Sequence, residues 1–301
     1  MNALISSQEV ASLLQVTETT VKRWANGGDL PCHKTLGGHR KYSLNEVLQF
    51  AELRQIKISG VIHTFPEMQQ EGIDFAIAAK NYNTISNFFL KKSLDADTEG
   101  LSSLLLYIVK HNIAFSTITD EIVRPALVRI GFLWSEGKLE INQERRATNT
   151  INEALIRLFP VLHKKPDNHH VAVCACIENE LHEIGLRAIS YTLESEGWKT
   201  HLLGANTPFE TLKNFVQTVH PHLVCLSFTL VKRKQQLLDE MQKFGKFLKR
   251  KKIKFVVGGF YAGMFTEQQL GCDHILLSAN DIVSFSKNVF QLKTGPKTKT
   301  K

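Results

Sequence analysis

Residues 173–185, VCACIENELHEIG, decide the architecture of the second half of the chain. An unbroken apolar run, typical of a strand buried on both faces, stops at a polar segment that contains Glu180 and His182. Gly185 follows three residues after the histidine. A histidine at the end of a buried strand is a solvated loop residue, a catalytic base or a metal ligand. The surrounding sequence has to decide between these three roles.

Four more short apolar runs follow the first one, and helical stretches separate them: THLLG, HLVCLSFT, KFVVGG and DHILL. This alternation predicts an α/β domain over residues 168–293, built on a flavodoxin-like, doubly wound parallel sheet of five strands. Ligands of such sheets bind at the carboxyl ends of the strands. The segments ENELH, GANTP, SFT and GG all fall at those ends.

The residues at the strand ends suit a metal-containing ligand. Glu180 can accept one ring N–H of His182, which fixes the tautomer and leaves the other ring nitrogen free to bind a metal. The remaining positions carry either a hydroxyl or no side chain, and so leave room for a bulky or flat group: Gly185, Ser227, Thr229, Gly258 and Gly259. The alternative interpretation is an unliganded sheet in which the glycine pair makes a tight strand-to-helix turn.

This set of motifs resembles the cobalamin-binding domain of methionine synthase and of corrinoid proteins. That family has the patterns Asp-x-His-x-x-Gly, Ser-x-Leu or a relative, and Gly-Gly; this chain has Glu180-x-His182-x-x-Gly185, Ser227-x-Thr229 and Gly258-Gly259, with LGANTP at 203–208. The resemblance implies that His182 replaces the benzimidazole of the cofactor as the lower cobalt ligand. It also implies that the nucleotide tail lies along Ser227 and the glycine pair. Glu180 is one methylene longer than the aspartate of the family.

The first 58 residues predict a DNA-binding domain. Helical patterns run through SQEVASLL and TETTVKRWANGG, the second closed by Gly27 and Gly28, and a third begins after Ser43. Between the second and third patterns, LPCHKTLGGHRKY has the glycines of a hairpin tip. Helix, turn, helix, hairpin and helix in this order make a winged helix-turn-helix.

In a winged helix-turn-helix the second helix enters the major groove of DNA. Trp24 would then pack inward. The residues expected to face bases or phosphates are Thr19, Thr20, Lys22 and Arg23 from this helix and Lys34, His39, Arg40 and Lys41 from the wing. The segment resembles the MerR family of transcription regulators, in particular members with a GGHRKY wing. The alternative is a basic module that binds another protein.

Residues 71–165 predict a bundle of four helices, over 73–94, 98–112, 116–137 and 141–159, after a linker at 59–70. Pro125 either kinks the third helix or marks its real start.

Within this region Trp134 precedes Glu144 by ten positions. This spacing resembles that of light-sensing cobalamin repressors of the MerR type, in which the helical bundle covers the upper face of the cofactor. Arg145 stands where those relatives have histidine, and Ser135 replaces a histidine that follows the tryptophan in some of them. Serine is a poor cobalt ligand compared with imidazole. The alternative interpretations are a core tryptophan and a surface arginine.

The composition agrees with a protein of the cytoplasm that binds DNA. The chain of 301 residues has a formal net charge of +8, and no run of 18 apolar residues interrupts it. The five cysteines lack metal-finger spacing, and three of them fall in strand-like runs, as expected for reduced thiols. Part of the charge is local: residues 243–254 hold seven basic residues and no acid, and the disordered tail predicted at 294–301 is also basic. For both segments a solvated surface is the simpler interpretation.

Together these resemblances imply a cobalamin-dependent transcriptional repressor, not an enzyme, that binds double-stranded promoter DNA as a homo-oligomer. They imply adenosylcobalamin as the cofactor, with methylcobalamin or hydroxocobalamin as other forms, and release of DNA when light removes the upper cobalt ligand. One alternative is a regulator that has lost the cofactor and responds to a protein partner. Another is a corrinoid methyl carrier, which has no use for a DNA-reading domain.

Overall fold

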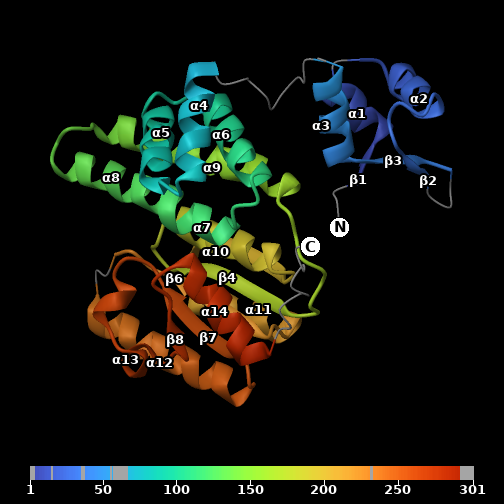
Figure 1. Cartoon of the computed structure of the whole chain (residues 1–301). Helices are drawn as coiled ribbons and strands as arrows, with labels where there is room; N and C mark the ends of the chain where they lie inside the picture. Colours follow the sequence, from blue (N-terminus) through green and yellow to red (C-terminus); the bar gives the residue numbers. More distant parts are fainter. Residues whose placement is uncertain are drawn as a thin grey trace. The chain divides into compact units, whose positions relative to one another are not determined.

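The computed structural model describes residues 4–14, 16–34, 38–54, 56, 67–230 and 233–291 (Figure 1). The chain divides into two compact units: Met1–Asn112 with Ala126–His163, and Ile113–Pro125 with Lys164–Lys301. Among the helices of the described residues, none has the length and apolar character needed to cross a bilayer. The tail predicted at 294–301 lies outside the described residues.

The N-terminal elements are β1 (Leu4–Ser6), α1 (Ser7–Leu13), α2 (Glu18–Asn26), β2 (His33–Lys34), β3 (Arg40–Ser43) and α3 (Leu44–Leu53). The sequence does not predict β1, and the elements after it follow the predicted order of helix, helix, hairpin and helix. The strands are antiparallel in the order β1-β3-β2. Thr17 caps α2 by accepting the backbone N–H of Thr20, and Gly27 ends the helix. Buried residues from all three helices and from β3 form one core, among them Val10, Val21, Tyr42 and Val47. The hairpin tip predicted at Leu36 and Gly37 lies outside the described residues.

The region predicted as four helices begins earlier and has an additional break. Its helices are α4 (Glu67–Ala78), α5 (Tyr82–Leu94), α6 (Thr98–Lys110), α8 (Arg124–Ser135) and α9 (Ile141–Leu158). The single helix predicted over 73–94 is wrong, because the chain turns at Lys80, which has a φ of 53°, and Asn81 then caps α5. The linker predicted at 59–70 is also too long, since α4 already starts at Glu67. Helix α9 packs against α5 and α6.

The third helical pattern contains a change of helix type before its proline. Helix α7 (Phe115–Ile118) continues into the π-helix η1 (Thr119–Val123), and α8 begins at Arg124. The backbone N–H of Arg124 donates to the carbonyl of Thr119, five residues back. Pro125 lacks an N–H and is the second residue of α8, so the proline accompanies the start of a helix.

The C-terminal unit is a parallel sheet with helices on both faces (Figure 1). Its strands are β4 (Val171–Ile177), β5 (Lys199–Thr207), β6 (Leu223–Ser227), β7 (Lys254–Gly258) and β8 (His274–Ile275), in the order β5-β4-β6-β7-β8. Counted along the chain this is 2-1-3-4-5, the order of flavodoxin-like sheets. The main helices are α10 (Ile184–Ser195), α11 (Phe209–Val219), α12 (Lys234–Arg250) and α14 (Ala279–Phe290), with the short helix α13 (Glu267–Leu270).

Alternate residues of β4 face opposite layers of this unit. Val173 and Ala175 belong to a core that includes α11 and α12, whereas Cys174 and Cys176 belong to a core with α10 and α14. Burial on both faces explains why β4 has no polar residue until it ends. The strand cysteines are free thiols, as predicted, and Cys174 pairs in register with Cys225 of β6.

Close backbone packing of α12 gives a test of this arrangement. A Cβ atom at Gly245 would lie 2.0 Å from the carbonyl oxygen of Gly271, so Gly245→Ala should lower the free energy of unfolding by about 2 kcal/mol, despite the higher helix propensity of alanine. The matched control is Gly185→Ala in α10, where no atom beyond the adjoining backbone of its own helix lies within 4 Å of the added methyl group. Urea denaturation of the two variants checks this, and equal stability would contradict the packing of α12.

Candidate functional site

The polar segment after β4 brings Glu180 back over the end of the sheet. The backbone N–H of Glu180 donates to the carbonyl of Ile177 at 3.1 Å, and its own carbonyl accepts from Asn206 N at 2.9 Å. Asn179 N donates to the side-chain oxygen of Asn206 at 2.8 Å. These bonds tie the loop after β4 to the end of β5, within the LGANTP segment, and they leave the Glu180 side chain only 2% exposed.

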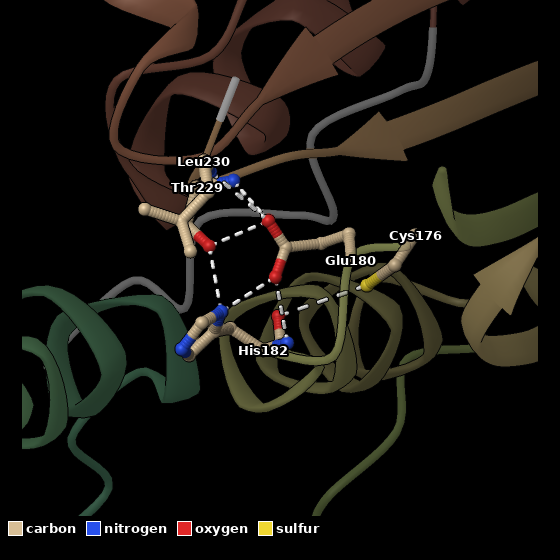
Figure 2. A network of polar contacts seen from close by, with 5 residues as sticks. All are labelled: Cys176, Glu180, His182, Thr229 and Leu230. Carbon is tan, nitrogen blue, oxygen red and sulfur yellow. Dashed lines mark hydrogen bonds and ion pairs between the residues drawn. The ribbon is translucent and has the colours of Figure 1, made fainter. Parts of the chain in front are cut away.

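The Glu180 carboxylate joins the ends of β4 and β6 through hydrogen bonds to both of its oxygens (Figure 2). Oε1 lies 2.8 Å from the backbone nitrogen of His182 and 2.5 Å from its ring Nδ1. Oε2 accepts from the Thr229 hydroxyl at 2.6 Å, from the Thr229 backbone N–H, and from Leu230 N at 3.2 Å. We call Glu180, His182 and Thr229 the strand-end clamp.

These hydrogen bonds decide the charge of the carboxylate. Burial alone would raise the pKa of Glu180, but the hydrogen bonds from Thr229 and His182 together outweigh it, and the pKa lies below its usual value of 4.5. Glu180 is therefore ionised at neutral pH and can only accept hydrogen bonds.

An ionised Glu180 determines which ring nitrogen of His182 is available. Nδ1 must carry the proton that it shares with the carboxylate, so Nε2 of the neutral ring has a free lone pair. The Thr229 hydroxyl oxygen also lies 2.9 Å from Nδ1. The His182 side chain is 61% exposed, and Figure 2 shows its second ring nitrogen pointing away from Glu180 and Thr229. An oriented imidazole with one accessible nitrogen is a metal-ligand geometry.

A cysteine next to the clamp is not a competing ligand. The Cys176 thiol lies 3.7 Å from the carbonyl oxygen of His182. Burial, together with the charges of Glu180 and Glu183, raises the pKa of Cys176 to about 12. The sulfur is therefore a protonated thiol at neutral pH, whereas metals bind the thiolate.

Sequence reasoning did not assign Thr229 to the clamp. It predicted a hydroxyl at the end of the third strand, but the contact with Glu180 spans 49 positions along the chain and depends on the pairing of β4 with β6. Ser227, the residue before the buried Phe228, is paired in register with Cys176 on one side and Gly258 on the other. The predicted hydroxyl and glycine positions thus lie side by side at one edge of the sheet.

The three site glycines have different surroundings. Gly259 has a φ of 101°, and a Cβ there would lie 2.1 Å from the carbonyl oxygen of Phe228, so the fold itself requires this glycine. A Cβ at Gly258 would make ordinary contacts at 3.5 Å with Leu276. At Gly185, in the first turn of α10, a Cβ would meet open space. Room for a ligand therefore exists at Gly185, whereas Gly259 is explained by the backbone alone.

Large apolar side chains surround the strand ends. Leu181, Leu230, Phe260 and Leu277 come directly after β4, β6, β7 and β8, in loops at the same edge of the parallel sheet, and each is more than half exposed. Soluble proteins rarely leave such residues together in water without a partner. A ligand that is both large and partly apolar would cover them.

The helical residues singled out from the sequence belong to the other unit and are described separately. Trp134 in α8 is 50% exposed, so the interpretation as a core aromatic is wrong. Glu144 in α9 accepts a hydrogen bond from the Thr148 hydroxyl at 2.9 Å, and Ser135 donates to the carbonyl of Phe132 at 2.8 Å. Arg145 is exposed.

The predicted DNA-facing residues are mostly accessible. Thr19, Lys22 and Arg23 lie on an exposed face of α2, and Lys22 pairs with Glu18 at 2.8 Å. Thr20 is partly buried, and its hydroxyl lies 3.0 Å from that of the capping Thr17, which occupies it within the helix start.

In the hairpin, Arg40 donates to the side-chain oxygen of Asn26 at 2.7 Å, which ties β3 to the end of α2. His39 is exposed and Lys41 partly so, whereas the side chain of Lys34 lies outside the described residues. Trp24 packs on Phe50 with ring centroids 4.9 Å apart, as predicted for an inward residue.

Comparison with known families defines the class of the protein. A helix-turn-helix domain family matches residues 4–54, one B12 binding domain family matches residues 170–283, and a second B12 binding domain family matches residues 89–158. The chain therefore combines a helix-turn-helix domain with B12-binding domains. The B12 binding domain match at 170–283 covers the parallel sheet, and the match at 89–158 lies in the helical region.

Individual relatives have the same combination or part of it. The chain is 25% identical over 255 residues to the HTH-type transcriptional repressor CarH of Myxococcus xanthus, which covers 80% of this chain and 84% of that protein. It is 24% identical over 166 residues to dimethylamine corrinoid protein 2 of Methanosarcina acetivorans, covering 54% and 76%. The solved structure of the Methanosarcina barkeri monomethylamine corrinoid protein matches with a TM-score of 0.57 at 16% identity, covering 67% of this chain and 96% of that chain, and shows the shared fold.

The residues of the strand-end site fit cobalamin. The clamp presents one imidazole nitrogen to a metal, Gly185 leaves open space beside it, and the apolar loop residues around the strand ends suit a macrocycle. A metal-centred ligand of this size is what a B12-binding domain holds.

The clamp predicts a specific effect of Glu180→Ala. The substitution leaves the backbone N–H groups of His182, Thr229 and Leu230 without their acceptor, so the free energy of unfolding should fall by about 1–3 kcal/mol. Because the ring of His182 loses its orienting partner, cobalamin affinity should fall about 10-fold to 100-fold. Urea denaturation and a spectroscopic cobalamin titration check both effects. Glu178→Ala, an exposed carboxylate in the same loop, is the control, and equal behaviour of the two variants would contradict the clamp.

Open space at Gly185 predicts that Gly185→Leu separates folding from ligand binding. No atom of the protein opposes the added side chain near the backbone, so the unfolding midpoint in urea should stay close to that of the wild type. Cobalamin affinity should fall at least about tenfold, since the leucine would occupy space assigned to the ligand. Full affinity in this folded variant would show that the ligand does not approach α10 here.

Proposed function

We propose that this protein is a cobalamin-binding transcriptional repressor that binds promoter DNA as a homo-oligomer and releases it when the upper cobalt ligand is lost. The observation that carries the proposal is the strand-end clamp, in which Glu180 and Thr229 hold Nδ1 of His182 and leave Nε2 accessible. The matches to a helix-turn-helix domain and to two B12 binding domain families, and the similarity to CarH, support it.

In this proposal His182 is the lower cobalt ligand, and Glu180 holds the proton on its other ring nitrogen. Ser227 and Gly258 line the path of the nucleotide tail, together with Gly259. Bound adenosylcobalamin, our preferred form over methylcobalamin and hydroxocobalamin, would supply a cobalt–carbon bond that light can break. The residues of the chain do no bond-making chemistry, and we propose that the protein is not an enzyme.

We infer that the helical region covers the upper face of the cofactor. The match of residues 89–158 to a B12 binding domain family and the exposure of Trp134 support this role. Trp134, Glu144 and Arg145 would then contact the cofactor. The Ser135 hydroxyl donates a hydrogen bond to the carbonyl of Phe132, and serine is a poor cobalt ligand, so a stable second cobalt ligand from that position is not expected.

The N-terminal domain would bind DNA as a winged helix-turn-helix of the MerR type. Thr19, Lys22 and Arg23 on the exposed face of α2 would enter the major groove, and Thr20 would contribute less because its hydroxyl is engaged at the helix cap. Lys34, His39, Arg40 and Lys41 would contact the backbone beside it. A cytoplasmic location follows from the DNA partner.

Two alternatives remain as outcomes of experiment. A corrinoid methyl carrier is supported by the similarity to dimethylamine corrinoid protein 2, but that similarity covers 54% of the chain, and a helix-turn-helix domain has no role in methyl transfer. A cofactor-independent regulator with a protein partner is consistent with Arg145 and Ser135. Stoichiometric methyl transfer would support the first, and failure to bind cobalamin would support the second.

The test of the proposal compares the wild type with His182→Ala, after reconstitution with adenosylcobalamin in the dark. We expect the wild type to keep the corrin absorbance after desalting, to shift a promoter duplex, and to release it after green light. The alanine variant should bind the cofactor at least about tenfold more weakly and lose the spectral sign of histidine-ligated cobalt, because no imidazole remains at the clamp. A wild type that stays colourless, or whose spectrum His182→Ala leaves unchanged, would refute the proposal.

A further inference from the structure

A shallow groove of about 870 Å³ on the surface of the C-terminal unit is lined by basic side chains. One wall comes from α11, with Glu210, Lys213 and Gln217. The other comes from α12 and carries Lys243, Lys246 and Arg250. We call this feature the α11–α12 basic groove. Its α12 wall lies in the segment 243–254, which holds seven basic residues and has no role in the proposed function.

The basic residues of α12 lie on the face of the helix that points away from the sheet. Met241, Phe244 and Leu248 are buried against the sheet, whereas Lys243, Lys246 and Arg250, spaced three and four residues apart, share the exposed face. The helix is held in place by Gly245, whose missing Cβ permits contact with Gly271, and by hydrogen bonds from Gln242 to the carbonyls of Gln268 and Gln269.

The charge of the groove is not neutralised from within. Lys243, Lys246 and Arg250 form no ion pair with any residue in the described part of the chain. The one acidic side chain lining the groove, Glu210, is paired with Lys213 at 3.4 Å. The turn after α12 continues the positive charge with Lys251 and Lys252, which are exposed. An unpaired set of cations on a rigid helix face is the electrostatic footprint of a polyanion site.

We propose that the α11–α12 basic groove binds the phosphate backbone of a DNA duplex. This contact would be independent of base sequence and would add to the contact made by the helix-turn-helix domain. The inference rests on the DNA binding of the proposed function. Lys243 and Arg250 are separated by about 10 Å along the helix axis, a length over which one DNA strand presents about three phosphates. The three cations therefore span a length over which a DNA strand presents more than one phosphate.

The composition of the groove favours DNA over other anionic partners. Protein interfaces have apolar or aromatic centres and few lysines, whereas Phe247 is the one aromatic residue lining this groove and is partly buried. A membrane-surface helix needs an apolar face to insert, and the apolar face of α12 is buried against the sheet. A chain that holds DNA through its N-terminal domain also raises the local concentration of phosphate around its other surfaces.

The experiment measures binding of the full-length protein to a duplex without an operator sequence, by fluorescence anisotropy over a range of salt concentrations. The test variant is Lys243→Gln, Lys246→Gln, Arg250→Gln. Each phosphate contact contributes about 0.9 to the slope of log affinity against log salt, so the slope should fall by about 2 to 3 units. The control, Lys80→Gln, Lys91→Gln, Lys110→Gln, removes the same charge from exposed positions in the helical region and should keep the wild-type slope. The variant Lys243→Arg, Lys246→Arg should keep it as well.

The outcomes separate this inference from the proposed function. If the wild type binds neither this duplex nor a promoter duplex, both fail; if it binds the promoter duplex alone, only the groove inference fails. If the wild type binds but the glutamine variant of the groove keeps its full slope, or if the control loses as much slope, the groove inference alone is overturned. The inference would also be overturned if the wild type binds vesicles containing phosphatidylserine and the glutamine variant of the groove does not, while both have the same slope on DNA. Light scattering and thermal unfolding establish that the compared variants share one oligomeric state and remain folded.

Discussion

The strand-end site depends on one buried carboxylate. Glu180 accepts hydrogen bonds on both oxygens from two strand ends that are far apart in the sequence, and these bonds keep it ionised although it is almost inaccessible. An ionised carboxylate cannot donate, so it selects the tautomer of His182 that has a free Nε2. The accessible lone pair is therefore set by the pairing of β4 with β6, because that pairing brings Thr229 to Glu180.

The same sheet edge combines rigid and open positions. Gly259 is required by its own backbone conformation and by the carbonyl of Phe228, so its presence would be explained without any ligand. Gly185 has no such internal reason, and the exposed apolar residues in the loops after the strands are likewise unexplained by packing within the unit. The case for a bound macrocycle thus depends on His182, Gly185 and the apolar loops more than on the glycine pair.

Much of this could be predicted from the sequence, because buried parallel strands are continuous apolar runs and their ends are marked by polar or glycine residues. The five strands, their flavodoxin-like arrangement and the hydrogen bond between Glu180 and the His182 ring follow from these signals. The role of Thr229 does not, since it requires the register between strands 49 positions apart. The break between α4 and α5 does not follow from the sequence either. The apolar periodicity continues across it, and a single residue, Lys80, makes the turn by adopting the left-handed backbone conformation.

The most direct test of the central claim identifies the atom beneath the cobalt. Protein labelled with nitrogen-15 only in histidine is loaded with cobalamin, reduced to the cobalt(II) form and examined by electron paramagnetic resonance. If His182 is the lower ligand, the nitrogen splitting of the cobalt signal is a doublet, and it reverts to a triplet in unlabelled protein. A triplet in the labelled protein would assign the position to the benzimidazole of the cofactor and contradict the account.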